Sequence, residues 1–189
     1  METFLSSWEL KKLGLKSYGH NVKISRNAMI YAPHLVEIGD NVRIDDFCTL
    51  SGKISFGNYV HLSQFVSLYG GYSGIVFHDF IAVAARTMIY AVSDDYVDAN
   101  LETPMVPMEY KKMIEGKVTI QSHVIFGANT VVLPNVTISE GSTFGALSLV
   151  TKDTREYSVN VGIPAKEIRK RSREVIELKD AFLKKEDGS

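Results

Sequence analysis

The sequence predicts an all-β fold, a single-stranded parallel β-helix, and three observations predict it. Aliphatic side chains recur every six residues, a second apolar set follows four residues after the first, and small or turn-forming residues recur between them. A helix repeats every 3.6 residues and a strand every two, so a period of six indicates short extended runs separated by corners. The first set is Ile38, Ile44, Leu50, Phe56, Leu62 and Leu68; the second is Val42, Cys48, Ile54, Val60 and Val66; corners include 39–41, 57–58 and 127–129.

Three such six-residue units make one coil of about eighteen residues. Inward aliphatic side chains stack on those of the next coil, and each backbone pairs with the coils above and below it. We expect an N-terminal cap at 1–22, a β-helix at 23–163 with an inserted loop at 94–117, and a C-terminal helix at 164–189.

The N-terminal cap contains a short predicted helix over 6–13. Ser6 and Glu9 have the spacing of a capping box, and Gly14 suits the residue after a helix end. A β-solenoid exposes its terminal coil, so an end cap is needed. This helix is the predicted cap.

The six-residue period enters at Ile24, Ile30 and Val36 and shifts its frame at 70–73. It continues to Ser93 and then stops. Residues 94–117 lack the period and contain Pro104 and Pro107. A long insertion without regular structure is usually functional or disordered. The period returns at Ile120, Phe126, Val132, Ile138, Phe144 and Val150.

From Pro164 the chain becomes highly charged. Apolar residues at Ile168, Val175, Leu178 and Phe182 have helical spacing, which predicts an amphipathic helix packed on the solenoid.

Composition excludes several classes of protein. The 189 residues contain 21 Lys and Arg against 22 Asp and Glu, a net charge of -1, which argues against nucleic-acid or anionic-membrane partners. The one cysteine, Cys48, falls on an inward position, so no disulfide framework is expected and a reducing compartment is favoured. Neither a signal peptide nor a membrane span is evident. We expect a cytoplasmic protein.

The six-residue units, together with GALSLVTKD (145–153) and GIPAKEIRK (162–170), resemble the hexapeptide-repeat acyltransferases. That resemblance implies a left-handed β-helix, a homotrimer and transfer of an acetyl group from acetyl-CoA to an amine or hydroxyl. The segments NVRIDDFCTLSG, IYAVSDDY and GALSLVTKD are similar to sugar acyltransferases of bacterial polysaccharide clusters, in particular the dTDP-4-amino-4,6-dideoxyglucose N-acetyltransferase type. A role in O-antigen or lipopolysaccharide synthesis is therefore expected.

The resemblance also implies cofactor contacts. Small corner residues would let the pantetheine arm of acetyl-CoA approach the backbone, and basic residues would meet its phosphates. Without the resemblance, corner sterics and solvated charges explain the same residues. The positions implied are Ala128, Ala146, Thr151, Lys152, Lys166 and Arg169.

The sequence departs from the family pattern at the catalytic base. Where galactoside and maltose acetyltransferases have a histidine, this chain has Asp94, followed by Asp95. A turn at the start of the insertion is the alternative explanation of this pair. His61, predicted to point outward, is the next candidate base. An amine acceptor needs less help from a base than a hydroxyl, which favours N-acetylation of a nucleotide-linked amino sugar by direct transfer.

Three alternatives remain open. One is O-acetylation of a saccharide hydroxyl. A zinc carbonic anhydrase needs three converging imidazoles, which the five histidines do not predict, and no metal is expected. A non-catalytic solenoid would lack acetyl-CoA binding.

Overall fold

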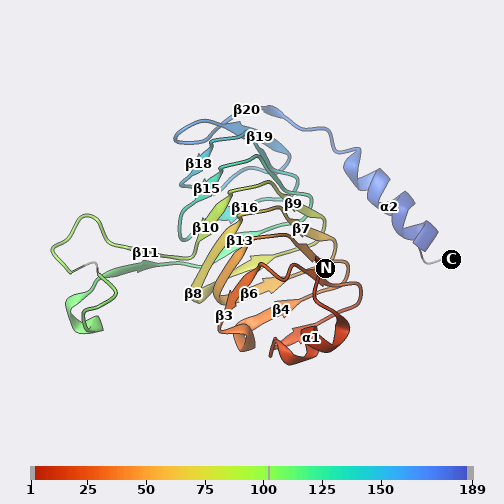
Figure 1. The fold of residues 1–189 in the computed structure, drawn as a ribbon. Helices are drawn as coiled ribbons and strands as arrows, with labels where there is room; N and C mark the ends of the chain where they lie inside the picture. Colours follow the sequence, from red (N-terminus) through yellow and green to blue (C-terminus); the bar gives the residue numbers. More distant parts are fainter. Residues whose placement is uncertain (1–2, 102, 187–189) are drawn as a thin grey trace.

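The computed structural model describes residues 3–101 and 103–186. The chain winds as a tapering stack of coils, with parallel strands on successive coils hydrogen-bonded to one another (Figure 1). This parallel β-solenoid confirms the fold class that the six-residue period predicts.

Each coil has three flat sides, and the first is an eight-stranded sheet within the described residues. We call it face 1. Its strands run parallel until the last pair, β19 and β20, which is antiparallel. They are β2 (Lys23–Ile24), β5 (Arg43–Ile44), β7 (Val60–Leu62), β9 (Ile81–Val83), β14 (Ile125–Phe126), β17 (Thr143–Phe144), β19 (Ser158–Val161) and β20 (Lys166–Lys170).

The other two sides form one continuous sheet, because β6 and β8 bend around the corner between them. Face 2 contains β3 (Met29–Tyr31), β10 (Met88–Tyr90), β15 (Val131–Val132) and β18 (Leu149–Val150). Face 3 contains β1 (Ser17–Tyr18), β4 (Val36–Ile38), β13 (Val118–Ile120) and β16 (Thr137–Ile138). Both faces share β6 (Thr49–Phe56) and β8 (Ser67–Phe77).

The frame shift at 70–73 lies at the bend of β8. Gly70 crosses the preceding coil so closely that a Cβ atom there would lie 2.2 Å from the Lys53 carbonyl oxygen. A side chain at this position would push the coils apart, which explains the glycine.

The core is the column of inward side chains predicted from the period. Residues such as Leu50, Leu62 and Phe126 are fully buried, and Phe126 stacks on Phe144 with ring centroids 5.2 Å apart. Cys48 also points inward, and burial raises the pKa of its thiol to about 11. A thiol in this state is a packing group, as predicted.

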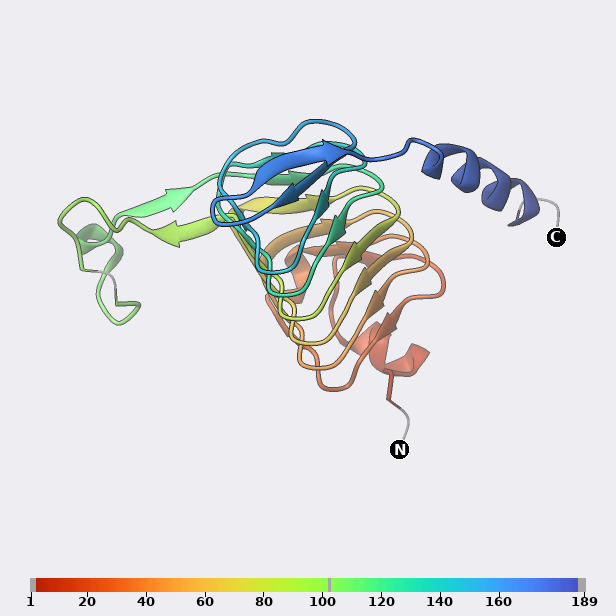
Figure 2. The same cartoon turned by 90° about the horizontal axis from the view of Figure 1, so that it is seen from above.

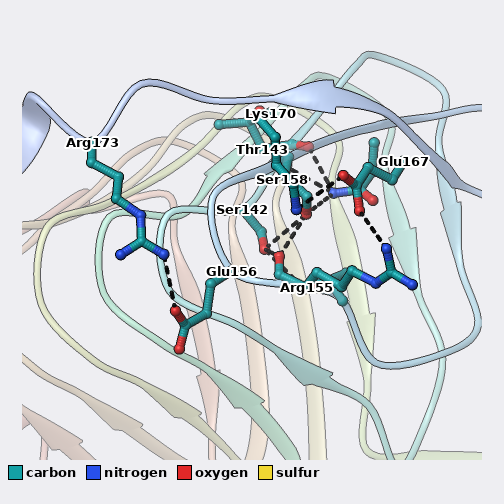
Figure 3. Close-up of polar contacts among 10 residues, drawn as sticks. Ser142, Thr143, Arg155, Glu156, Ser158, Glu167, Lys170 and Arg173 are labelled. Atoms are coloured by element: carbon teal, nitrogen blue, oxygen red, sulfur yellow. Dashed lines mark hydrogen bonds and ion pairs between the residues drawn. The ribbon is translucent and has the colours of Figure 1, made fainter.

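Different devices close the two ends of the core. At the N-terminal end, α1 (Ser7–Lys12) begins with the predicted capping box between Ser6 and Glu9 and buries Leu10. At the other end, polar side chains replace aliphatic ones: Ser142 and Ser158 donate hydrogen bonds to the Arg155 carbonyl at 3.0 and 2.6 Å (Figure 3). The last coil therefore satisfies its buried polar groups internally.

The insertion after β10 is a hairpin arm. Strand β11 (Val92–Asp94) pairs antiparallel with β12 (Met113–Glu115), and a short 3-10 helix, η2 (Met108–Tyr110), lies within the connecting loop. The prediction of an insertion without regular structure is wrong for these segments, because the arm completes its own backbone pairing. The arm projects away from the solenoid on the side opposite the C-terminal helix (Figures 1 and 2).

The predicted helix boundary at Pro164 is wrong. Residues 166–170 form β20, which pairs with β19, and α2 spans Val175–Glu186. Without β20, strand β19 would leave an unpaired edge on face 1. The backbone pairing that β20 provides outweighs the helical spacing of its apolar residues. The η1 turn (Pro33–Leu35) completes the list of helical segments among the described residues, and no helix in that part of the chain is long and apolar enough to cross a membrane.

The expected packing of α2 is also only partial. The helix buries none of its described residues, and Leu178 is 69% exposed. It touches the solenoid through Phe182, whose ring lies edge-on to Tyr59 at 5.4 Å, while the Tyr59 hydroxyl bonds Glu186. An open groove remains between α2 and face 1.

Candidate functional site

The predicted cofactor alanines lie on one edge of the solenoid, between face 1 and face 2. We call this edge corner A; it comprises residues 45–48, 63–66, 84–87, 127–130 and 145–148 of successive coils. Ala128 and Ala146 stand on adjacent coils, where the Leu147 N–H donates to the Ala128 carbonyl at 2.9 Å. A Cβ on Gly127 would lie 2.5 Å from the Ala146 nitrogen. The coils are thus closely packed, and the side chains at these two positions are single methyl groups.

Corner A repeats one backbone conformation. Its turn residue has a φ between 58° and 62° on five coils, although none of these residues is glycine. In the coils toward the N-terminus this residue is Phe47 and then Phe65, half-exposed rings that stack at 5.0 Å between centroids. The complete set is Phe47, Phe65, Arg86, Asn129 and Leu147.

The predicted phosphate contacts gather at the C-terminal end. Thr151, Lys152 and Arg169 line one cavity of about 600 Å³, a volume typical of small-ligand sites. Arg155 and Lys170 add positive charge to it, and both face Glu167, at 3.9 and 3.2 Å respectively (Figure 3). Such a cluster of exposed cations can bind phosphate oxygens.

Lys166 does not line this cavity. It begins β20 opposite Val161, and the neighbouring Ala165 N–H donates to the Leu149 carbonyl at 2.8 Å. This position lies near the last coil of corner A. The structure therefore brings Thr151, Lys152 and Arg169 together, and places Lys166 beside the edge that carries Ala146.

His61 lies on face 1, as an outward side chain that is 43% exposed. Its Nε2 atom is 2.8 Å from Oδ2 of Asp45, a carboxylate that is nearly buried. The Arg43 Nε–H donates to Oδ1 of the same carboxylate at 2.7 Å. Burial raises the pKa of Asp45, but hydrogen bonds from Arg43 and His61 outweigh it and hold the pKa below its ordinary value. Asp45 is therefore ionised at neutral pH.

His61 also lines the groove under α2, which has a volume of about 540 Å³. Tyr59, Phe80 and His123 form a stack along its wall, with centroid distances of 4.6 and 5.4 Å. Burial lowers the pKa of His123, so its imidazole is neutral and packs as an aromatic ring. His123 contributes structure to this wall.

Asp94 and Asp95 have different surroundings. Asp94 ends β11, opposite Met113, and its side chain is partly exposed at the base of the arm. Asp95 is buried and accepts the Val97 N–H at 2.9 Å, with Lys112 Nζ at 3.4 Å. Asp95 thus organises the loop of the arm, which leaves Asp94 as the available carboxylate.

The candidate bases do not converge within one chain. Asp94 stands beyond face 2, on the arm, whereas His61 stands on face 1. Corner A runs between these two faces. Among the described residues, no three or more His, Cys, Asp or Glu side chains gather closely enough to hold a metal ion.

Sequence reasoning missed Asp45, Arg43 and Arg155. Arg43 and Asp45 flank the inward Ile44, and residues two apart on a strand share a face. The sequence alone could therefore have predicted that the Arg43 and Asp45 side chains lie on the same outer face. The contact between Asp45 and His61 could not be predicted in this way, because it depends on stacking one coil on the next.

Comparison with known proteins finds close relatives over the whole chain, although no family model matches it. An Escherichia coli protein described as dTDP-4-amino-4,6-dideoxy-D-glucose acyltransferase is 41% identical over 182 residues, covering 95% of this chain and 94% of the relative. AntD, an N-acyltransferase from Bacillus cereus, was solved in complex with dTDP and 3-hydroxybutyryl-CoA. It is 44% identical, with a TM-score of 0.96 over 99% of this chain and 100% of that one.

A serine-to-cysteine variant of AntD was solved with dTDP-4-amino-4,6-dideoxyglucose and coenzyme A. It is 45% identical and has a TM-score of 0.95, over 98% of this chain and 99% of that one. Nearly every residue of the present chain therefore has a counterpart in proteins of one kind.

Proposed function

This chain belongs to the family of dTDP-4-amino-4,6-dideoxy-D-glucose acyltransferases, and from this premise we propose that it transfers an acetyl group from acetyl-CoA to the amine of a nucleotide-linked amino sugar. The observation that carries the proposal is the alignment of Ala128 and Ala146 on corner A, next to the end of the solenoid that holds the basic cavity. A long ligand with an apolar arm and a phosphate-rich head fits this order.

Acetyl-CoA lies along the C-terminal half of corner A in this proposal. The pantetheine arm passes over Ala128 and Ala146, where side chains are smallest. Its phosphates meet Lys166 and the cavity formed by Thr151, Lys152 and Arg169. Charge-assisted hydrogen bonds from lysine and arginine supply this part of the affinity.

The acceptor amine attacks the thioester carbonyl directly. The nitrogen–carbon bond forms as the carbon–sulfur bond breaks, the amine loses one proton, and the thiolate of CoA gains one. No covalent enzyme intermediate is involved, since Cys48 is buried. Holding both substrates together supplies much of the rate.

A homotrimer completes the site in this proposal. The arm of residues 92–115 projects away from its own solenoid, and its tip exposes apolar residues. In an assembly, the arm would bring Asp94 of one copy to corner A of the next. The exposed large apolar residues among the described part of the arm are Tyr96, Val97, Leu101, Met105, Met108, Tyr110 and Ile114.

We place this reaction in the cytoplasm, in the synthesis of an O-antigen or another surface polysaccharide. Both nucleotide sugars and acetyl-CoA are cytoplasmic metabolites. The product would be an N-acetylated sugar donor for a glycosyltransferase.

A second candidate is transfer to a saccharide hydroxyl. One observation favours it: Asp45 holds the His61 ring on face 1 through a 2.8 Å contact, and a histidine oriented by a carboxylate is an arrangement that serves as a general base toward hydroxyl groups. Sugar hydroxyls need such a base in the transition state.

Release of CoA with a panel of acceptors tests the proposal. The panel contains dTDP-, UDP- and GDP-linked amino sugars and unsubstituted glycosides, each offered with acetyl-CoA. We expect turnover with the nucleotide-linked amines, most of all with a dTDP-linked one. Turnover with hydroxyl acceptors alone would overturn it.

Replacing Asp94 by asparagine and His61 by alanine tests the two candidate bases. A loss of about tenfold or more in kcat/KM identifies a base. If both variants keep full activity, neither residue takes the proton.

A further inference from the structure

We propose that Arg155 and Lys170 bind the 3′-phosphate of CoA, and that Glu167 holds both cations until this phosphate replaces it. The inference rests on the proposed function and deepens it, because it assigns one end of the cofactor to residues that the family resemblance does not name. Figure 3 shows the three side chains together at the C-terminal end of the solenoid.

One carboxylate serves two cations in this cluster. Oε1 of Glu167 lies 3.2 Å from Nζ of Lys170, and Oε2 lies 3.9 Å from Nη1 of Arg155. The Glu167 side chain is 26% exposed, whereas those of Arg155 and Lys170 are 81% and 67% exposed. Both cations line the basic cavity, so a second anion can reach them there.

A β-bulge in β20 creates this arrangement. Side chains three apart on a regular strand point to opposite faces. The pairing of β20 with β19 passes from Arg169 directly to Glu167 and skips Ile168, which shifts the alternation by one residue. Glu167 and Lys170 therefore reach the same side of the strand. Bulges commonly redirect side chains in this way next to functional sites.

The backbone of Arg155 is held in place by hydrogen bonds. Its carbonyl oxygen accepts from the Ser142 and Ser158 hydroxyls at 3.0 and 2.6 Å (Figure 3). The guanidinium stays exposed above this anchored backbone. Arg155 can therefore change its ionic partner without any change in the solenoid.

The cavity carries more positive than negative charge, with four cationic side chains and two carboxylates among its lining residues. One carboxylate, Asp153, accepts the Thr137 backbone N–H at 2.7 Å. The other, Glu167, pairs with cations of the same cavity and is the anion that a ligand must replace. The cations are Lys152, Arg155, Arg169 and Lys170.

A phosphate monoester is a better partner for two cations than one carboxylate is. At neutral pH it carries a charge of about −1.5 to −2 and three terminal oxygens that accept hydrogen bonds. Ion pairs between exposed side chains are weak, and contacts of arginine or lysine with phosphate are stronger. The phosphate therefore displaces Glu167, and the carboxylate is left to the solvent.

The order of groups along CoA identifies which phosphate this is. In the proposed binding mode the pantetheine arm lies on corner A, and Lys166 stands beside the edge that carries Ala146. The diphosphate follows the arm directly, so Lys166 is its nearest cation. The 3′-phosphate lies farther along, on the ribose, and it is the monoester of the molecule. It reaches the cavity with Arg155 and Lys170.

Three variants of the full-length protein test the exchange: Glu167→Gln, the double variant Arg155→Gln with Lys170→Gln, and Glu156→Gln as the control. Isothermal titration measures the Kd of each variant for CoA and for 3′-dephospho-CoA, which lacks only the monoester.

Glu156 is a matched control for Glu167. It pairs with Arg173 at 3.4 Å at the same end of the solenoid, and neither residue lines the cavity. Figure 3 shows this pair on the other side of Ser142 and Ser158 from Glu167. Replacing either glutamate by glutamine changes the net charge by the same amount, so the comparison separates local competition from overall charge.

We expect Glu167→Gln to lower the Kd of CoA about three- to tenfold, because an amide does not compete for the two cations. The Kd of 3′-dephospho-CoA should change less than about twofold. The double cation variant should raise the Kd of CoA about tenfold or more and bring it close to that of 3′-dephospho-CoA. Glu156→Gln should match the wild type with both ligands.

The inference is overturned if Glu167→Gln weakens CoA binding or leaves it unchanged, since Glu167 would then orient the cations or have no part in binding. It is also overturned if Glu167→Gln tightens both ligands equally, or if Glu156→Gln tightens CoA as much. The double cation variant remains informative if Glu167→Gln unfolds: if it still distinguishes CoA from 3′-dephospho-CoA as the wild type does, the assignment is wrong. Failure of the proposed function looks different, because the wild type would then bind neither ligand or release no CoA with amine acceptors.

Discussion

The two halves of corner A share a backbone and differ in their side chains. Toward the C-terminus the edge carries Ala128 and Ala146, at the positions that Asp46 and Gln64 occupy on coils toward the N-terminus. At the next position, the C-terminal coils have Asn129 and Leu147 and the N-terminal coils have Phe47 and Phe65. The turn conformation is the same on both halves, with φ near 60° at one residue of each coil.

This difference separates what the fold requires from what a ligand requires. Left-handed backbone at a bulky residue is unfavourable, so exposed phenylalanines at Phe47 and Phe65 are not a requirement of the turn. Asn129, at the equivalent position of another coil, is the residue that this conformation favours. We propose that the half with Ala128 and Ala146, called here the smooth half, accommodates the cofactor arm, because its side chains at these two positions are the smallest along the edge.

The largest expected effect comes from filling the smooth half. Replacing Ala146 by tryptophan should raise the dissociation constant of acetyl-CoA about 100-fold or more, because the ring occupies the path of the pantetheine arm. Isothermal titration with CoA measures it. Binding of dTDP, which lacks this arm, should change little.

Ala181→Trp is the control for this substitution, since Ala181 is an exposed alanine of α2, away from corner A. Normal CoA affinity in Ala146→Trp would remove the distinction between the two halves. Retained thermal unfolding cooperativity in both variants excludes a general loss of fold.

A smaller effect is expected at the basic cavity. Lys152→Ala and Arg169→Ala should each weaken CoA about five- to tenfold, because each removes one charge-assisted contact from an exposed site. The loss should diminish at high salt, which screens exposed charges. Titration at low and high ionic strength measures both predictions.

Lys11→Ala provides the matched control, because Lys11 is an exposed lysine of α1 at the other end of the solenoid. If it weakens CoA as much as Lys152→Ala does, the effect reflects net charge alone. Equal losses for CoA and for pantetheine would also contradict phosphate binding at the cavity.

Sequence patterns predicted the regular part of this molecule well for a physical reason. Inward positions such as Leu62 and Phe126 are buried and apolar, as the core requires on each coil. The six-residue period is therefore repeated over many coils of the sequence. The capping box of Ser6 and Glu9 is equally local. The small residues Ala128 and Ala146 of corner A were singled out by the family resemblance, because corner sterics alone explain them equally well.

Patterns failed where a contact joins distant segments. Strand β20 has helical spacing in sequence, but pairing with the last edge of face 1 determines its structure. The contact of Asp45 with His61 could not be predicted from the sequence, because the two residues are sixteen positions apart. Such contacts depend on how one coil is aligned with the next. The sequence of a single six-residue unit does not show that alignment.

The smallest expected effect is a pH dependence of stability in the half with Asp45. Burial raises the pKa of this carboxyl, but Arg43 and His61 outweigh burial, so its folded pKa lies below the unfolded value of about 3.9. A depressed pKa contributes stability that is present above the unfolded pKa and lost as pH falls through the folded one. Asp45→Asn removes this contribution at all pH values.

The unfolding free energies of wild type and Asp45→Asn should therefore differ most above about pH 5 and approach each other below about pH 4. Urea denaturation at a series of pH values measures the difference. Asp40→Asn removes the charge from an exposed pair with His20 and keeps an oxygen that can accept the His20 backbone N–H. It should show less convergence, since solvent screens that charge interaction. A constant difference between wild type and Asp45→Asn would mean that Asp45 stabilises the fold through packing and hydrogen-bond geometry, independently of its charge.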